Sequence, residues 1–176
     1  MKDLTDAGAR KEQIQGAFQL VQQAEAAATI AKKTYDRMQN LYNDGVISGQ
    51  KRDEAFAAYK EAQKYVGTPY VWGGSTPETG FDCSGYVCWV YNQNGYDVGR
   101  TTANGLWNKC QKISEAEAKP GDLVFFKGTY DTPGMSHTGI YLGNGMMVSA
   151  GDPIKYANIH SSYWQQYLAG FGRLSK

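Results

Sequence analysis

The chain of 176 residues changes composition sharply near residue 62, and this break limits the folds that it can adopt. Residues 1–62 contain 4 of the 21 glycines and no proline, tryptophan or cysteine, and they are rich in Ala, Gln, Lys and Glu. Residues 63–176 contain all five prolines, all four tryptophans and the other 17 glycines. The composition therefore predicts two regions: long helix over 1–62 and a compact mixed domain over 63–176.

Apolar residues in the first region recur in steps of three and four, which is the spacing of a coiled-coil seam. These residues are Ile14, Phe18, Val21, Ala24, Ala28, Ala31, Tyr35, Met38 and Tyr42. The segment "NDGVISG" at residues 43–49 then interrupts the helix with Gly45, and Ser48 is suited to cap the next helix. We expect a helical hairpin whose seam needs a partner, and self-association of the chain would supply one.

The stretch "YDRMQNLYNDGVISGQKRDEAFAAYKEA" resembles the hairpin tip of HlyD-type periplasmic adaptor (membrane fusion) proteins, over about residues 8–62. The tips of that family carry an Arg, a Leu and a Ser at the spacing of Arg37, Leu41 and Ser48. The resemblance implies that these three residues dock onto a TolC-like outer-membrane channel. The lipoyl and barrel domains that flank the family's hairpin have no counterpart here, so a helix joined by cloning or gene rearrangement is the alternative interpretation.

Turn residues and hydrophobic periodicity divide the second region into helices followed by strands. The predicted elements are helices over 50–66, 83–93 and 101–112, a strand over 122–126, a β-hairpin over 137–150, and a closing strand in "LAGFGRL". We expect Gly143-Asn144-Gly145 to form a three-residue hairpin loop, because these residues tolerate positive φ. A helical block followed by an antiparallel sheet is the α+β class.

Charge and cysteine content exclude several functions. The net charge of +1 gives no electrostatic basis for binding nucleic acid or an anionic membrane. Three cysteines without a C-x-x-C pair, and only two histidines, predict neither a metal site nor a disulfide framework. No apolar run approaches the roughly 20 residues that span a bilayer. The first residues do not read as a signal peptide, so an export signal would lie outside this sequence.

Cys83 begins the predicted helix over 83–93, where unpaired N–H groups and the helix dipole favour a thiolate. His137 begins a predicted strand after a polar loop, so its imidazole is a candidate base for a thiol nucleophile. A lone cysteine is more often a core residue, and spacing alone leaves both interpretations open. We expect Cys88 to be buried packing and Cys110 to be structural or incidental.

The blocks "GTPYVWGG", "FDCSGYV", "PGDLVFF", "HTGIYLGNGMMV" and "GFGRL" resemble, in this order, the NlpC/p60 family of cysteine peptidases. The resemblance spans about residues 55–174, and the later part is more similar still to C-terminal domains of the cell-wall hydrolases found on conjugative transposons. It implies a papain-like fold, Cys83 as nucleophile, His137 as general base and no cofactor. It also implies cleavage of the γ-D-glutamyl to diamino acid bond of peptidoglycan stem peptides. The residues that would line the substrate site are Tyr70, Trp72, Asp82 and Ser84.

One position departs from that family. Its third catalytic residue, usually His and sometimes Asn or Gln, falls twelve residues after the first His, which is Ser149 here. If residues 143–145 form the hairpin loop, Ser149 lies opposite Gly139 and shares a sheet face with His137. Asp152 and His160 are the alternatives for orienting the imidazole. We expect weaker orientation by serine, and therefore reduced activity or a protein that only binds wall peptides.

The predicted organisation is therefore a hairpin over 1–62 and an NlpC/p60 domain over 63–176. Two functions remain open at this stage: a cell-wall endopeptidase in the cell envelope or outside the cell, and an adaptor that docks through its hairpin to a TolC-like channel.

Overall fold

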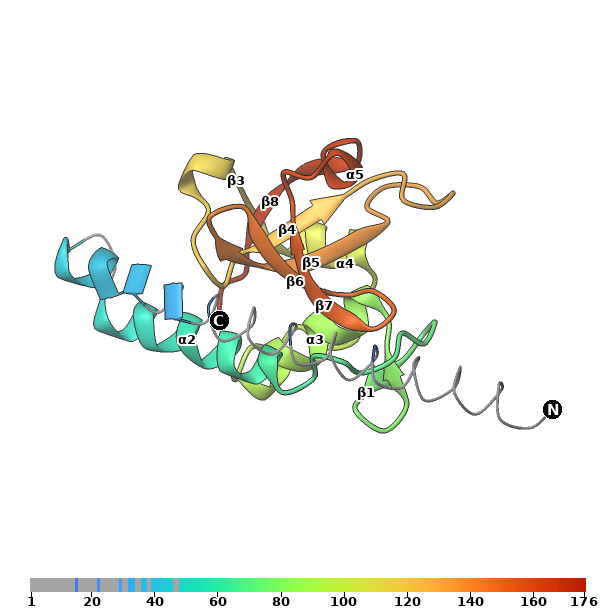
Figure 1. Ribbon diagram of the computed structural model, residues 1–176, viewed down its shortest axis with the longest axis horizontal. Helices are drawn as coiled ribbons and strands as arrows, with labels where there is room; N and C mark the ends of the chain where they lie inside the picture. The colour runs from blue at the N-terminus through green and yellow to red at the C-terminus, as the bar shows by residue number, and fades with distance from the viewer. Residues whose placement is uncertain are drawn as a thin grey trace. The chain divides into compact units, whose positions relative to one another are not determined.

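The computed structural model of the chain (Figure 1) describes residues 15, 22, 29, 32, 33, 36, 37, 39–45 and 48–176. The chain divides into two compact units, Met1–Arg37 and Met38–Lys176. The described residues up to Asn43 are helical, and the turn at Gly45, with φ of 70°, ends that helix as the sequence predicts. All the predicted seam residues except Tyr42 lie outside the described residues, and the side chain of Tyr42 is exposed.

The second unit contains an antiparallel sheet and the helices that pack on it. Its helices are α2 (Gly49–Gln63), α3 (Cys83–Gln93), α4 (Ala103–Lys109), the 3-10 turn η1 (Glu115–Glu117) and α5 (Ser162–Gln165). Its strands are β1 (Ser75–Thr76), β2 (Gly80–Phe81), β3 (Gln111–Ile113), β4 (Leu123–Phe126), β5 (His137–Gly143), β6 (Met146–Ala150), β7 (Ile154–Asn158) and β8 (Leu168–Arg173). This arrangement confirms the predicted α+β class.

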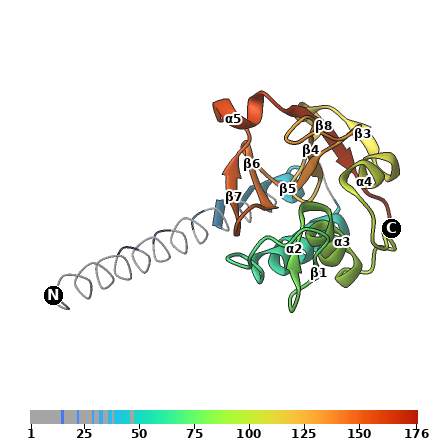
Figure 2. The same cartoon turned by 90° about the vertical axis from the view of Figure 1, so that its right-hand side faces the viewer.

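The main sheet has the strand order β3-β8-β4-β5-β6-β7, and β1 pairs with β2 in a separate ribbon. Helix α3 packs against β5 and β6, and α2 packs against α3, so two helices lie on one side of the sheet (Figures 1 and 2). The hydroxyl of Tyr86 in α3 donates to the carbonyl of Ala62 in α2 at 2.8 Å. Because Ala58, Tyr59 and Ala62 are buried, α2 is part of the compact domain.

Helix α3 begins and ends where the sequence predicts. Its N-cap is Asp82, whose carboxylate accepts from the backbone N–H of Gly85 at 2.6 Å. The predicted apolar face is buried and consists of Tyr86, Val87, Val90 and Tyr91. A Cβ at Gly85 would lie 2.1 Å from the carbonyl oxygen of Gly74, so only glycine lets this helix approach the preceding loop. The start of α3 is therefore fixed both by its cap and by close packing.

The hairpin of β5 and β6 differs slightly from its prediction. Gly143 pairs with Met146, so Asn144 and Gly145 form a two-residue turn with φ of 52° and 70°. A register shift between Tyr141 and Gly143 absorbs the extra residue. The pairing of Ile140 with Val148 continues to Gly139 and Ser149, as expected, because a Cβ at Gly139 would lie 3.0 Å from that of Ser149.

Other boundaries were predicted wrongly or missed. The predicted helix over 101–112 ends at Lys109, because residues 111–113 form β3 and pair with β8. The helix predicted over 50–66 ends at Gln63 in successive turns, and the strand expected from Asp122 begins at Leu123. The sequence analysis missed β7 and α5. Strand β7 lies at the edge of the described sheet and pairs with β6. Its limits therefore follow from hydrogen bonding to β6 rather than from its own residue pattern.

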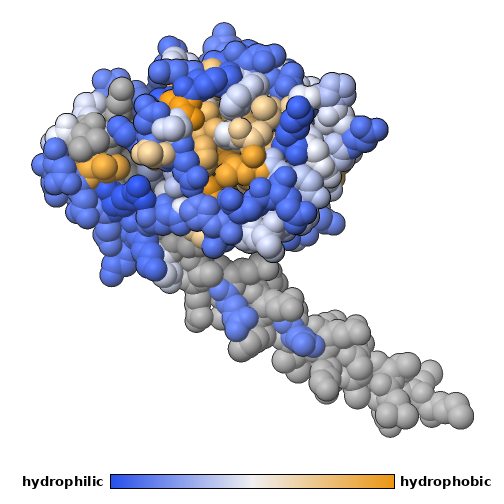
Figure 3. Space-filling model, turned by 90° about the horizontal axis from the view of Figure 1, so that it is seen from above, coloured by the Kyte–Doolittle hydropathy of each residue, from blue (hydrophilic) through white to orange (hydrophobic). Residues whose placement is uncertain are grey.

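Alternate strand residues point to opposite faces of the sheet. The face away from α3 carries a core cluster that includes Val124, Phe126, Tyr141 and Met147, and Trp164 of α5 packs against it. On the surface drawn in Figure 3, apolar residues gather in the middle and hydrophilic residues surround them. In the part of the chain that the structure describes, no helix is long and apolar enough to cross a membrane.

Candidate active site

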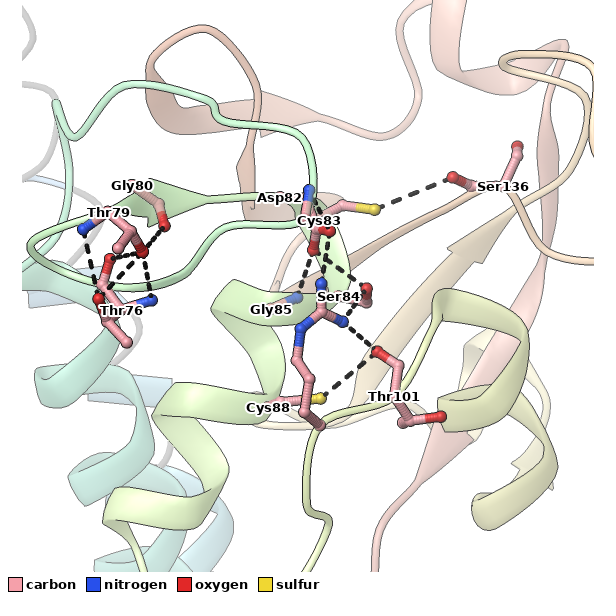
Figure 4. A network of polar contacts seen from close by, with 12 residues as sticks. Thr76, Thr79, Gly80, Asp82, Cys83, Ser84, Gly85, Cys88, Thr101 and Ser136 are labelled. Carbon is pink, nitrogen blue, oxygen red and sulfur yellow. Dashed lines mark hydrogen bonds and ion pairs between the residues drawn. The ribbon is translucent and has the colours of Figure 1, made fainter.

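Cys83 is the first residue of α3, and its sulfur lies against the backbone next to His137. Its Sγ donates to the carbonyl oxygen of Ser136 at 3.9 Å, and the backbone N–H of Thr138 faces the same sulfur. Figure 4 shows Cys83 pointing from the start of the helix toward Ser136. The sulfur thus lies against the backbone on both sides of His137, next to the residue that the sequence predicts as the base.

The environment of Cys83 does not lower the pKa of its thiol. Burial raises this pKa to about 11, and the negative charge of Asp82 adds to the increase. The backbone N–H groups of Thr138, Ser84 and Cys83 itself act in the opposite direction, but burial outweighs them. The predicted thiolate is therefore not the resting form, because a buried thiol beside a carboxylate keeps its proton.

His137, at the start of β5, lies among aromatic side chains. Its ring stacks on Trp164, with 5.1 Å between centroids and 26° between planes, and it is tilted by 49° against Phe126 at 5.9 Å. The residue is partly exposed as a whole, yet its Nε2 atom is buried and has no hydrogen-bond partner among the described residues. Burial lowers the pKa of His137 to about 4, so the imidazole is neutral near pH 7.

Ser149 lies on the same sheet face as His137 and is buried. Within the described residues, its hydroxyl and the His137 ring form no hydrogen bond with each other. The alternative His160 is exposed at the far end of the β5–β6 hairpin, near Gly145, where its Nε2 contacts Glu115 at 2.6 Å, so it does not orient His137. Asp152, the other alternative, is exposed.

Asp82 and Ser84 flank Cys83, and both belong to one polar network. Asp82 Oδ1 accepts from the N–H of Gly85 at 2.6 Å and from the Ser84 hydroxyl at 3.1 Å. Its Oδ2 accepts from the N–H of Gly73 at 3.1 Å and from Arg100 Nη2 at 2.5 Å. Arg100 Nη1 also donates to the Ser84 hydroxyl at 3.0 Å. All four acceptor positions of the carboxylate are therefore used inside the protein.

Two residues of this site were missed by the sequence analysis. Arg100 lies 18 residues from its ion-pair partner Asp82, and no local pattern joins the two. Tyr130 forms an edge-to-face pair with Trp72, with 5.4 Å between ring centroids, and both side chains are exposed. An aromatic residue in the polar loop just before His137 was the signal that could have indicated Tyr130.

Tyr70 belongs to the same group of residues. Burial raises the pKa of its hydroxyl to about 12, and the charges of Cys83, Asp82 and Tyr130 raise it further while Arg100 lowers it. Tyr70 therefore lies within electrostatic reach of Cys83, the network around Asp82 and Tyr130 of the exposed aromatic pair. The predicted substrate residues are thus neighbours of Cys83.

The other two cysteines lie outside this group. Cys88 is buried one turn further along α3, and its sulfur donates to the carbonyl oxygen of Thr101 at 3.8 Å (Figure 4). Cys110 is buried against Gly172 of β8. Both are packing residues, as predicted. Among the described residues, no group of three or more His, Cys, Asp or Glu side chains is arranged to hold a metal ion.

The predicted docking residues fall in both units. Arg37 ends the first unit, whereas Leu41 and Ser48 belong to the second. Leu41 is partly buried and lines a hollow of about 430 Å³ with residues of α2, Tyr96 and the last residues of the chain. Ser48 is exposed and directly precedes α2, where a capping residue is expected.

A cysteine at the start of a helix that packs on an antiparallel sheet, with a histidine at the first residue of the adjoining strand, is the arrangement of a papain-like cysteine hydrolase. Residues 67–173 match the NlpC/P60 family, and the chain belongs to that family. Residues 11–67 match a second family, described as "RND MFP, alpha-helical hairpin domain". Both resemblances seen in the sequence are confirmed.

Known proteins similar to this chain include an endopeptidase and the domain of a peptidoglycan hydrolase. The bifunctional muramidase/DL-endopeptidase CwlT of Bacillus subtilis is 52% identical over 116 residues, which are 65% of this chain and 35% of CwlT. The NlpC/p60 domain of the peptidoglycan hydrolase SagA is 37% identical, with a TM-score of 0.57 over 68% of this chain and 98% of that domain.

A lipoprotein-like NLP/P60 protein of Staphylococcus aureus is also similar in structure. It is 42% identical, with a TM-score of 0.68 over 70% of this chain and 42% of that protein. The match to CwlT covers about a third of that protein, and the match to the probable endopeptidase p60 of Listeria seeligeri covers 21% of its length. The similarity therefore concerns one part of longer relatives.

Proposed function

We propose that this protein is a peptidoglycan endopeptidase that cleaves the γ-D-glutamyl to diamino acid bond of stem peptides. The observation that carries the proposal is the position of the Cys83 sulfur, which contacts the backbone on both sides of His137. Membership of the NlpC/P60 family and the endopeptidase activity in the name of CwlT support the substrate class. Such a substrate places the protein in the cell envelope or outside the cell.

The reaction would proceed through a thioester. The sulfur of Cys83 attacks the γ-glutamyl carbonyl carbon while its proton passes to the neutral imidazole of His137. Backbone N–H groups at the start of α3 stabilise the resulting oxyanion. The C–N bond then breaks, and the leaving amine takes the proton from His137. Water hydrolyses the thioester by the same route, giving one proton to His137, which returns it to the sulfur.

The resting protonation states decide the order of these steps. Burial keeps the Cys83 thiol protonated and the His137 imidazole uncharged. The proton must therefore move as the sulfur attacks, and His137 acts as a general base rather than as one half of a preformed ion pair. Exposed Trp72 and Tyr130 offer apolar surface for the peptide beside this centre.

The test is digestion of purified sacculi and of a synthetic stem peptide, with the released fragments identified by mass. Cys83→Ala is expected to abolish cleavage, because no other described thiol contacts the backbone at His137. Cys88→Ala is the matched control on the same helix and should keep activity within about twofold of the parent, since Cys88 lies outside the site. Unchanged release by Cys83→Ala would refute the proposal.

We propose channel docking as a second function, supported by the match of residues 11–67 to the adaptor hairpin family. Arg37, Leu41 and Ser48 would contact a TolC-like channel, and Leu41 would have to leave the hollow that it lines. Arg37→Ala should then weaken binding of the full chain to such a channel about tenfold, with exposed Lys32→Ala as the control. Absence of binding by the parent chain in surface plasmon resonance would exclude this function.

A further inference from the structure

Among the described residues, no polar side chain is hydrogen-bonded to the ring of the proposed general base His137. Its Nε2 atom is buried without a hydrogen-bond partner among the described residues, and Ser149, at the position of the family's third catalytic residue, forms no hydrogen bond with the ring. A buried imidazole with an unpaired nitrogen is costly, and nothing polar fixes its rotation. Some other contact must therefore hold the ring at the angle that the reaction needs.

Aromatic packing supplies that contact. The His137 ring lies against Trp164 on one side, nearly parallel to it, and Phe126 is tilted against the same ring. Trp164 and Phe126 also contact each other, with 4.5 Å between their ring centroids. Because Phe126 belongs to the buried core of the sheet and Trp164 packs on that core, the two rings form a rigid support.

Helix α5, which carries Trp164, is attached to the segment that precedes it by a hydrogen bond and by packing. The side-chain amide of Gln165 donates to the carbonyl oxygen of Ile159 at 3.0 Å, and Ile159 is fully buried. Tyr163 adds an edge-to-face contact to Trp164 at 5.0 Å. The indole is thus fixed by its own helix and by the core, and it lies against one face of the imidazole.

We propose that Trp164 is the positioning residue of the general base, and that its stacked indole replaces the polar third residue of the family. The proposal rests on the proposed peptidase reaction, in which His137 accepts the thiol proton. Trp164 thus fixes the orientation of the neutral base, with no contribution from Ser149.

The groups around the ring allow a clear titration experiment. The elements packed against it present Phe126 of β4, Ser149 of β6 and Trp164 of α5, with Tyr163 next to the indole. The thiol of Cys83 is the titratable group that lies against the backbone next to His137. The chain contains only two histidines, so in a His160→Gln background one imidazole signal remains for NMR.

Turnover of a stem peptide tests the proposal in four variants. Trp164→Ala should lower kcat about 10- to 100-fold and change KM less than about threefold. The base then loses its orientation, whereas binding of the substrate is unaffected. Trp164→Phe should keep most of kcat, since a benzene ring can stack as well. In the Trp164→Ala background, Ser149→Asn should recover at least about fivefold by giving Nε2 a polar partner. Tyr167→Ala removes another partly buried aromatic residue from the same core and should leave kcat within about twofold.

The imidazole titration gives a readout that does not need turnover. In the Cys83→Ser, His160→Gln protein, Trp164→Ala should move the pKa of His137 from about 4 toward its ordinary value near 6.5, because water reaches the ring. An unchanged titration and an unchanged kcat would overturn the proposal, as would equal losses from Trp164→Ala and Tyr167→Ala. If the parent protein cleaves no peptide, the proposed function fails. The titration still tests whether Trp164 packs against the ring of His137.

Discussion

The two candidate catalytic residues are held by opposite kinds of interaction. The start of α3 is fixed by a polar network in which Asp82 accepts four hydrogen bonds and pairs with Arg100, whereas His137 is held between aromatic rings with its Nε2 unpaired. Hydrogen bonds fix the orientation of a side chain through their own directions, and the loss of one partner disturbs the whole network. Packing against aromatic rings fixes a side chain through the shape of its neighbours, and it tolerates substitutions that conserve their volume. Cys83 and His137 therefore differ in which substitutions can disturb their positions.

The largest expected effect concerns the thiol. Since the pKa of Cys83 is raised to about 11, the thiolate fraction and hence the rate of alkylation by iodoacetamide should increase about a thousandfold between pH 7 and pH 10. The rate is read from mass spectra of the peptide that contains Cys83, with Cys88 as an internal control. Rapid, selective alkylation of Cys83 well below pH 7, as the helix position alone predicts, would show that the thiol is activated after all.

The next effect concerns the base. The folded chain holds His137 with a pKa of about 4, below the ordinary 6.5 of the unfolded chain, so between these values only the unfolded chain is protonated. The contribution of the neutral His137 to the free energy of unfolding should therefore be complete above about pH 6.5. It should be lost as the pH drops to 4, which lowers the free energy of unfolding by on the order of 3 kcal/mol. Urea unfolding at several pH values measures it.

His137→Gln is the matched variant for this pH dependence, because it removes the titrating group and keeps a polar side chain. Its unfolding free energy should vary less between pH 4 and 6.5 than that of the parent. The exposed contact of His160 with Glu115 stays the same in both proteins and cancels in the comparison. Parallel curves for the two proteins would mean that the ring of His137 is not held neutral by burial.

The smallest effect concerns the polar network. Asp82→Ala removes the N-cap of α3 and leaves Arg100 and two backbone N–H groups without their acceptor, so we expect a loss of about 2 kcal/mol in unfolding free energy. Asp82→Asn keeps an acceptor at the cap and should lose about half as much. Both values come from urea unfolding at pH 7. Equal losses in the two variants would show that charge, rather than capping, fixes the helix start.

Much of this organisation is visible in the sequence because it depends on neighbours in the chain. The limits of α3 follow from Asp82 as a cap, the apolar spacing after Cys83 and the stop at Gly95. The hairpin turn follows from residues that accept positive φ, and the position of Ser149 follows from the two-residue period of paired strands. Such local patterns carry the secondary structure around the two candidate catalytic residues.

What the tertiary structure decided lies in contacts between distant segments. Strand β3 exists because residues 111–113 pair with β8, although their own sequence continues a helical pattern. Arg100 pairs with Asp82, which lies 18 residues earlier in the chain. Trp164 of α5 stacks on His137 at the start of β5. The sequence by itself determined the family, the α+β class and the two candidate catalytic residues. Only the fold decided that the thiol is buried and protonated and that the base is held by aromatic rings, because pKa and orientation depend on which groups surround a side chain in space.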